Sequence, residues 1–140
     1  MKELGKILKT FSATKETSGL PRPIVSELNL IENHGIQNDK FAGKKLDQTV
    51  MIVGVESYEI AKKNILLDFD PHNFEVGTQF FIGASIIEIT QICTVCNHLN
   101  VFDEKLPQLL KSHRGLYCKI IKSGIIQKDM IVKKKKKKNI

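Results

Sequence analysis

Two cysteines and a histidine crowd into six positions of the segment TQICTVCNHL, residues 90–99, in a chain of 140 residues. Cys93 and Cys96 have the C-x-x-C spacing that zinc knuckles and thioredoxin-like redox motifs share, and His98 follows two positions later. These residue types allow four interpretations: a metal site, a redox pair, a single reactive thiol, or ordinary packing. The functional interpretation of the whole chain depends on which of them holds.

A structural zinc ion needs four ligands, which normally come from two paired sets. The remaining candidate ligands are scattered along the chain: Cys118, His34, His72 and His113. A site built from Cys93, Cys96 and His98 with His113 is geometrically conceivable, but no second pair supports it. A thioredoxin-type pair would precede a helix whose amino terminus lowers the thiol pKa, and the segment after Cys96 has no strong helix start. Both interpretations are therefore weakly supported.

A single reactive thiol at Cys96 is the simpler hypothesis. Cys96 follows the end of a predicted strand, in a polar stretch where Thr94, Asn97 and His98 can reach solvent. His98 could stabilise a thiolate or shuttle a proton if the loop folds back. The competing interpretation is a buried loop cysteine beside a solvated histidine. Cys118 lies in an alternating stretch and is predicted to be a core residue without chemistry.

The sequence around these residues predicts mostly short β-strands separated by turns. The expected strands are Lys6–Thr10, Ile24–Ile31, Gln48–Val53, Thr78–Ile82, Ser85–Ile92, Gly115–Lys122 and Ile125–Val132. Gly83 and Ala84 predict a tight hairpin, and short helices are expected at residues 56–64 and at Leu106–Ser112. Many strands with two short helices predict a mostly β protein, either a β-barrel or a β-rich α+β domain.

Composition and charge narrow the class of protein. The net charge is +7, but Lys133–Lys138 carry six of these charges, so the rest of the chain is near +1. We therefore predict one domain over residues 1–132, a disordered lysine-rich tail over residues 133–140, and no specific binding of nucleic acid. The start of the chain has no apolar core of the length that a signal peptide needs, and no stretch is long enough to span a membrane. We expect a cytoplasmic protein with reduced thiols.

Four blocks of the sequence, in order, resemble the MOSC domain family, named for the carboxy-terminal part of molybdenum cofactor sulfurase. GLPRPIVSELNLIENHGIQNDKFAGK, residues 19–44, is similar to its first strand and its Gly-Ile-x-Gly-Asp-x-His-Ala-Gly loop. QTVMIVGVES, residues 48–57, is similar to the strand that leads into its helix. VGTQFFIGASIIEITQICTVC, residues 76–96, resembles the strand pair that ends at the characteristic cysteine, and RGLYCKIIKSGIIQKDMIV, residues 114–132, resembles the closing pattern.

This resemblance implies a MOSC-like β-barrel that handles sulfur or molybdenum cofactor. It assigns the characteristic cysteine to Cys96, which would carry sulfur as a persulfide or contact molybdenum cofactor (molybdopterin), with His98 as a proton donor. By motif position, Asp39, Lys40 and Arg114 would border the site and contact the cofactor or another anion. The implied activity is that of a sulfurtransferase or sulfur carrier, with molybdenum-ion and pyridoxal phosphate binding as associated family properties and no structural metal. The implied partners are a sulfur donor such as a cysteine desulfurase, or a molybdoenzyme.

The sequence departs from the family pattern at three positions. Asn38-Asp39 replaces the usual Gly-Asp, Phe41 replaces the usual histidine, and Asp47 stands where relatives tend to have arginine. The Phe41 change removes a titratable group, and the Asp47 change exchanges an anion partner for a like charge. Two alternatives therefore stay open beside the sulfur carrier. One is a non-catalytic binding module on the same barrel, and the other is a Cys/His zinc-binding domain.

Overall fold

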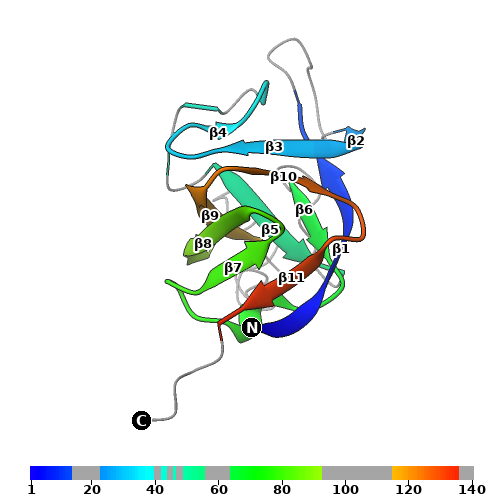
Figure 1. Cartoon of the computed structure of the whole chain (residues 1–140), viewed down its shortest axis with the longest axis vertical. Coiled ribbons are helices and arrows are strands. Elements are labelled where there is room, and N and C mark those ends of the chain that lie inside the picture. Colours follow the sequence, from blue (N-terminus) through cyan, green and yellow to red (C-terminus); the bar gives the residue numbers. More distant parts are fainter. Residues whose placement is uncertain are drawn as a thin grey trace, which may run out of the picture.

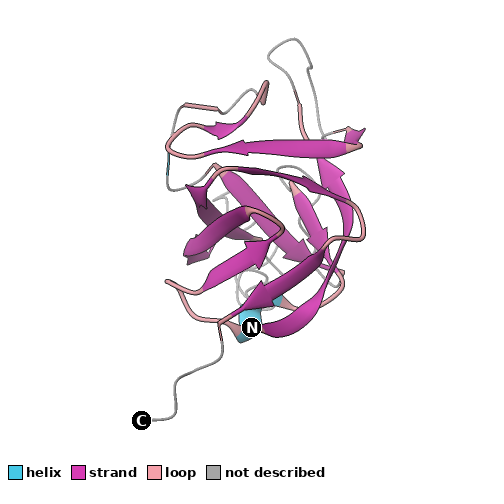
Figure 2. Ribbon diagram, in the orientation of Figure 1, coloured by secondary structure: helices cyan, strands magenta, loops and turns pink. Residues whose placement is uncertain are grey.

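The chain folds into short strands joined by tight turns (Figures 1 and 2). The structure is a computed structural model and describes residues 1–13, 23–39, 42–43, 46, 49–55, 64–92 and 115–135. Its strands are β1 (Lys2–Phe11), β2 (Ile24–Val25), β3 (Glu27–Ile31), β4 (Gly35–Ile36), β5 (Val50–Gly54), β6 (Ile65–Leu67), β7 (Gln79–Ile82), β8 (Ser85–Ile92), β9 (Leu116–Lys122), β10 (Gly124–Gln127) and β11 (Ile131–Lys134). A single 3-10 turn, η2 (Pro71–Asn73), is the helical element of these residues.

Seven of the strands close into a barrel. The order β11-β7-β8-β9-β5-β6-β1 forms one continuous sheet, and an antiparallel pairing between β1 and β11 joins its two ends. Closure removes the free edges that would otherwise expose unpaired backbone groups. The fold is therefore mostly β and barrel-shaped, as the number and spacing of the predicted strands indicated.

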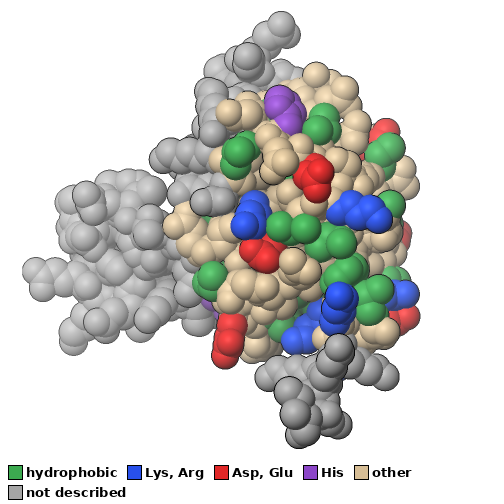
Figure 3. All heavy atoms as spheres, turned by 60° about the vertical axis from the view of Figure 1, so that its left-hand side comes forward, with side chains coloured by type: hydrophobic (Ala, Val, Ile, Leu, Met, Phe, Trp, Pro, Cys, Tyr) green, Lys and Arg blue, Asp and Glu red, His purple; other side chains and the backbone are tan. Residues whose placement is uncertain are grey.

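Alternation along each strand places aliphatic side chains inside the barrel. Phe80, Ile87 and Cys118 illustrate the pattern, since each is at most 1% exposed and the residues that follow them in sequence are less buried. The interior is filled by side chains from every barrel strand: Ile7, Val50, Ile52, Ile65, Leu67, Phe80, Ile82, Ile87, Ile89, Leu116, Cys118, Ile120 and Val132. The outer face carries charged residues around a band of hydrophobic side chains (Figure 3).

A second, three-stranded sheet in the order β10-β3-β4 lies across one end of the barrel (Figure 1). Leu28, Leu30 and Ile126 point from it into the same core, where each is at most 1% exposed. Gly124 begins β10 where a Cβ atom would lie 2.8 Å from the backbone nitrogen of Ser85. The glycine thus permits the close approach that lets this sheet cover the barrel.

Two predicted strands are wrong because a bend divides each of them between the two sheets. The stretch Ile24–Ile31 breaks at Ser26, so that β2 pairs with β1 of the barrel while β3 pairs with β10. The stretch Ile125–Val132 breaks at a turn that includes Asp129, whose φ is +71°. The strand assignment joined apolar residues on both sides of each bend into one strand, although the alternation of apolar and polar residues is interrupted at Ser26-Glu27 and at residues 127–129.

The remaining predicted elements have different outcomes. Ser85–Ile92 is confirmed with its bounds, and the Gly83–Ala84 hairpin is confirmed by the pairing of Ile82 with Ser85. Strand β6 was not predicted: its three residues lie between the helix expected at residues 56–64 and the loop that follows it. The expected helix at residues 106–112 and nearly all of that at 56–64 lie outside the described residues.

The end of the last barrel strand differs from the expected domain boundary. We placed that boundary after Val132, and β11 continues for two residues to Lys134, with Lys134 paired to Lys2. Within the described part of the chain, no helix has the length and apolar character that crossing a membrane requires.

Candidate functional site

The predicted site residues fall mostly outside the part of the chain that the structure describes. Asp39 is described, whereas Lys40, Cys96, His98 and Arg114 are not. The same holds for Cys93 and His113 of the alternative zinc site, so the structure does not report whether any of these side chains meet. The described residues nearest to the predicted site in sequence are the loop around Asp39 and the strands β8 and β9.

Asp39 holds its own loop against the end of β1. Its side chain is 4% exposed, and its Oδ1 atom accepts a hydrogen bond from Ser12 Oγ at 2.7 Å and another from the Ala13 amide at 3.3 Å. Its backbone amide donates to the Ile36 carbonyl, and its own carbonyl accepts from the Ala42 amide. These bonds anchor the loop to the end of β1, while the contact of Asp39 with a cofactor stays a prediction.

The backbone of this loop explains one departure from the family pattern. Gly35, Asn38 and Gly43 all have positive φ angles, of +126°, +66° and +76°. Glycine adopts such angles freely, and asparagine tolerates the left-handed region better than most residues. Asn38 in place of the family's glycine therefore preserves the turn that presents Asp39 to Ser12.

Strands β8 and β9 flank the cysteine segment in sequence, and Ile92 of β8 and Leu116 of β9 are paired at one end of the barrel. They are antiparallel, and their register runs from Ile86 opposite Lys122 to Ile92 opposite Leu116. The described part of β8 therefore ends beside the start of β9. Cys93 and Cys96 follow the first of these residues, and Arg114 precedes the second.

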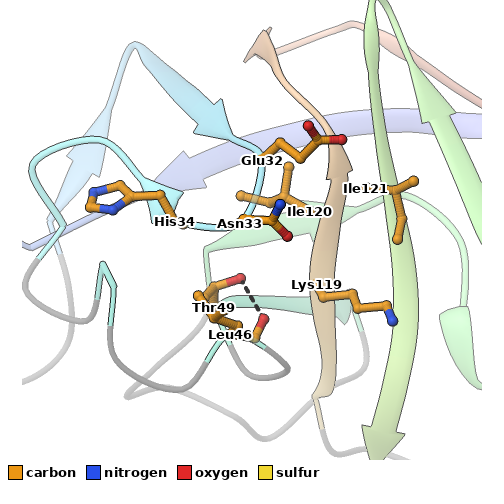
Figure 4. A pocket seen from close by; sticks show the side chains of 9 residues that line it. Glu32, Asn33, His34, Leu46, Thr49, Lys119, Ile120 and Ile121 are labelled. Atoms are coloured by element: carbon orange, nitrogen blue, oxygen red, sulfur yellow. Dashed lines mark hydrogen bonds between the residues drawn. The ribbon is translucent and has the colours of Figure 1, made fainter.

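A pocket of about 350 Å³ lies beside the loop, between the β3–β4 turn and β9 (Figure 4). Its lining residues are Glu32, Asn33, His34, Gly35, Leu46, Thr49, Lys119, Ile120 and Ile121. Thr49 Oγ1 donates to the Leu46 carbonyl at 3.3 Å on its floor. The imidazole of His34 lies on one side and the ammonium group of Lys119 on the other (Figure 4). The sequence analysis did not single out these residues as pocket residues, because they come from segments far apart in the chain.

The electrostatics of the pocket are mixed. Lys119 Nζ lies 3.4 Å from Glu88 Oε2, and Gln79 Nε2 donates to Glu88 Oε1 at 3.1 Å. Glu32 adds a carboxylate at the opposite rim. The described residues in and around the pocket therefore carry both positive and negative groups, and positive charge is not concentrated there.

Cys118 is confirmed as a core residue. It is 0% exposed, and it faces the barrel interior beside Leu116 and Ile120. Burial raises the pKa of its thiol far above the ordinary value of 9.0, and the negative charge of Glu88 raises it further. The neutral thiol is a poor nucleophile and a poor metal ligand, so Cys118 is unsuited to either chemistry.

Asn64 is a buried polar residue that the sequence analysis missed. It is 2% exposed and links three strands: its Oδ1 accepts from the Met51 amide at 2.9 Å, and its Nδ2 donates to the Phe11 carbonyl at 3.1 Å. We had assigned it to the end of a helix, and no local signal distinguishes it from an exposed asparagine. Its role is structural, since it supports the start of β6.

Metal ligands do not gather in the described part of the chain. No group of three or more histidine, cysteine, aspartate or glutamate side chains is arranged there to hold a metal ion. Cys93, Cys96, His98 and His113 lie outside that part, so this finding does not bear on the zinc interpretation.

The closed barrel, the capping sheet and the loop around Asp39 define the class of fold as a MOSC-like β-barrel. Solved structures of similar shape include YiiM from Escherichia coli, with a TM-score of 0.66 and 17% identity over 96% of this chain and 72% of that one. The YuaD protein from Bacillus subtilis has a TM-score of 0.65 and 12% identity over 94% and 96% of the two chains. YiiM and YuaD are MOSC-domain proteins.

A further solved structure, of a hypothetical protein, has a TM-score of 0.70 and 16% identity, and the match covers 93% of this chain and 68% of that one. No family model matches the sequence, and no curated protein matches it. At these identities the comparisons establish the fold. They do not establish the activity.

Proposed function

We propose that this chain is a MOSC-like sulfur carrier in which the thiol of Cys96 accepts a sulfane sulfur and holds it as a persulfide. The supporting observation is the register of β8 and β9 within a barrel similar to those of MOSC-domain proteins. Ile92 and Leu116 are paired, Cys96 follows the first by four positions and Arg114 precedes the second by two. At full extension these separations correspond to at most about 14 Å and about 7 Å, so the chain length allows both residues to reach the same end of the barrel.

The proposed transfer is an exchange between two thiols with no net oxidation. The Cys96 thiolate attacks the terminal sulfur of a persulfide on the donor, forming a new sulfur–sulfur bond as the bond to the donor cysteine breaks. The donor leaves as a thiolate, and Cys96 becomes the persulfide. His98, two positions away, would favour the reactive thiolate as imidazolium or supply a proton. A cysteine desulfurase is the class of donor that provides such a persulfide.

Molybdenum cofactor is the second ligand that the fold class implies, and the described residues fit it poorly. Its phosphate would require cationic side chains or clustered backbone amides. Asp39 is itself an anion and is engaged by Ser12 and Ala13, while Lys119 is paired with Glu88. Lys40 and Arg114 are the remaining proposed anion contacts. We therefore assign the cofactor no part in the sulfur transfer.

Sulfur loading tests the proposal directly. The purified chain is incubated with a cysteine desulfurase and cysteine, and its intact mass is measured without reductant. We expect wild type to gain the mass of one sulfur atom and Cys96→Ala to gain none. Cys93→Ala and Cys118→Ala are matched controls and should load like wild type, since Cys118 is buried and Cys93 is not assigned the role.

The other outcomes separate the alternatives. Loading of wild type that persists in Cys96→Ala would refute the site assignment. A stoichiometric zinc content with no loading would favour the zinc domain. Absence of both would favour the binding module, for which the pocket between His34 and Lys119 is the described candidate.

A further inference from the structure

A row of side chains on the outer face of the barrel combines lysines with hydrophobic residues. Lys133 of β11 is paired with Phe81 of β7, and Phe81 is paired with Ile86 of β8. Ile86 is paired in turn with Lys122 of β9. Four neighbouring strands thus contribute one line across the sheet, with an aromatic and an aliphatic residue at its centre and a lysine at each end.

The direction of these side chains follows from their neighbours. Phe80, Ile87 and Val132 are at most 1% exposed inside the barrel, so the adjacent Phe81, Ile86 and Lys133 point outward. The register between β8 and β9 shifts at Ile86, which places two β9 residues, Ile121 and Lys122, opposite one β8 residue. Ile121 thereby extends the hydrophobic part of the row.

Additional residues widen this outer row. Ile131, two positions before Lys133, is 39% exposed, and the Nζ atom of Lys135 lies 5.8 Å from the centre of the Phe81 ring. Figure 3 shows hydrophobic side chains gathered on one face of the molecule, with both basic and acidic side chains around them. We call this surface the lysine-flanked face, defined by Phe81, Ile86, Ile121, Lys122, Ile131, Lys133 and Lys135.

The charges around the face are predominantly positive. Glu3 of β1 lies opposite Lys133 in the strand register, and Glu88 next to the row forms an ion pair with Lys119. Lys122 and Lys135 are exposed, and Lys135 leads into three more lysines at positions 136–138. Two copies of this face would repel each other, so self-association does not explain it. A negatively charged partner with an apolar layer complements it.

We propose that the lysine-flanked face binds the surface of an anionic lipid bilayer. Aliphatic and aromatic side chains would enter the boundary between headgroups and acyl chains, while the lysines on either side reach the lipid phosphates. Each lysine of such a cluster strengthens the attraction to an anionic membrane. A nucleic acid would match the charge but would leave Ile86, Ile121 and Ile131 without a partner. This inference goes beyond the proposed sulfur transfer and does not rest on it.

Co-sedimentation with vesicles tests the inference on the full chain. Vesicles of phosphatidylcholine alone are compared with vesicles containing phosphatidylglycerol, at low and at raised salt. We expect binding only to the anionic vesicles, with a loss at raised salt because lysine–phosphate attraction is screened. Lys133→Glu should lower the partition coefficient about thirtyfold, since it removes one attractive charge and adds a repulsive one.

Matched variants separate the contribution of the lysine-flanked face to binding from the contributions of net charge and of lysines 136–138. Lys9→Glu makes the same change in charge on exposed β1, opposite Leu66, and should reduce binding much less than Lys133→Glu. Ile86→Thr keeps the β-branched shape and should lower the partition coefficient severalfold, with circular dichroism checking that the fold is retained. K136S/K137S/K138S reports the contribution of the following lysines.

Three results would overturn the inference. The first is equal loss of binding in Lys9→Glu and Lys133→Glu. The second is binding that depends on lysines 136–138 and is unchanged in both Lys133→Glu and Ile86→Thr. The third is tight binding of a single-stranded RNA oligonucleotide by a chain that does not sediment with anionic vesicles.

Discussion

At the scale of single residues, the surroundings of Cys118 decide its chemistry. Cys118 is sealed among aliphatic side chains and close to the charge of Glu88, so its thiol is held in the neutral form. Cys96 follows β8 by four positions in a polar stretch of the sequence and lies outside the described residues, so its role as a sulfur carrier stays a proposal.

Cys118 makes the stability of the fold depend on pH. Its pKa is raised in the folded state, so above the ordinary value of 9.0 the unfolded chain loses a proton that the folded chain retains. Stability from this group is fully present below that pH and falls by about 1.4 kcal/mol per pH unit above it. Urea unfolding between about pH 8 and about pH 10.5 measures this slope.

Cys118→Ala is the variant that isolates this contribution. Other groups titrate in the same range, and the difference between wild type and the variant removes them. We expect the stability advantage of wild type over Cys118→Ala to shrink as pH rises through 9.0. A difference that stays constant over this range would contradict the assignment of a buried neutral thiol.

At the scale of elements, one polar side chain supports the only parallel pairing recorded among the described strands. β5 and β6 run parallel, with Ile52 opposite Ile65, and Asn64 precedes β6. Its amide donates to the Met51 carbonyl at 2.9 Å and its carbonyl accepts from the Phe11 amide at 2.8 Å. Together with its two side-chain hydrogen bonds, these contacts link Asn64 at the start of β6 to both neighbouring strands, β5 and β1.

Removing the Asn64 side chain should therefore destabilise the barrel. Asn64→Ala leaves the Met51 amide and the Phe11 carbonyl without these buried partners, and we expect the free energy of unfolding to fall by about 3 kcal/mol. Asn29→Ala is the control, because Asn29 bonds to Gln37 at the surface, and should change stability by less than about 0.5 kcal/mol. Similar losses in the two variants, measured by urea unfolding, would contradict this role.

At the scale of the whole molecule, the last strand closes the barrel. β11 lies between β1 and β7, and its Val132 is 0% exposed in the core. A chain that ends after Gln127 lacks this strand and leaves β1 and β7 with unpaired edges. We expect it to show no cooperative thermal unfolding by circular dichroism, because seven-strand closure is lost.

A chain that ends after Lys135 is the matched control for this truncation. It keeps β11 and the contacts of Lys134 and Lys135 with the rings of Phe74 and Phe81. Its Tm should lie within about 2 °C of that of the full chain. Cooperative unfolding of the chain ending at Gln127 would show that the barrel does not require β11.

The amino-acid sequence alone determined the strand-rich class, the Gly83–Ala84 hairpin and the burial of Cys118. These features depend on alternation and turn chemistry within a few neighbouring residues, so local pattern is sufficient. Ser85–Ile92 was predicted with its bounds for this reason.

Only the tertiary structure decided that the chain changes sheet at Ser26 and near Asp129, that β6 pairs in parallel with β5, and that Asn64 is buried. It also decided which distant residues form the pocket and that Lys133, Phe81, Ile86 and Lys122 share one row. Each of these depends on the register between strands that are far apart in sequence. Register is fixed by closing the barrel as a whole, and a local pattern of hydrophobic residues is compatible with several such closures.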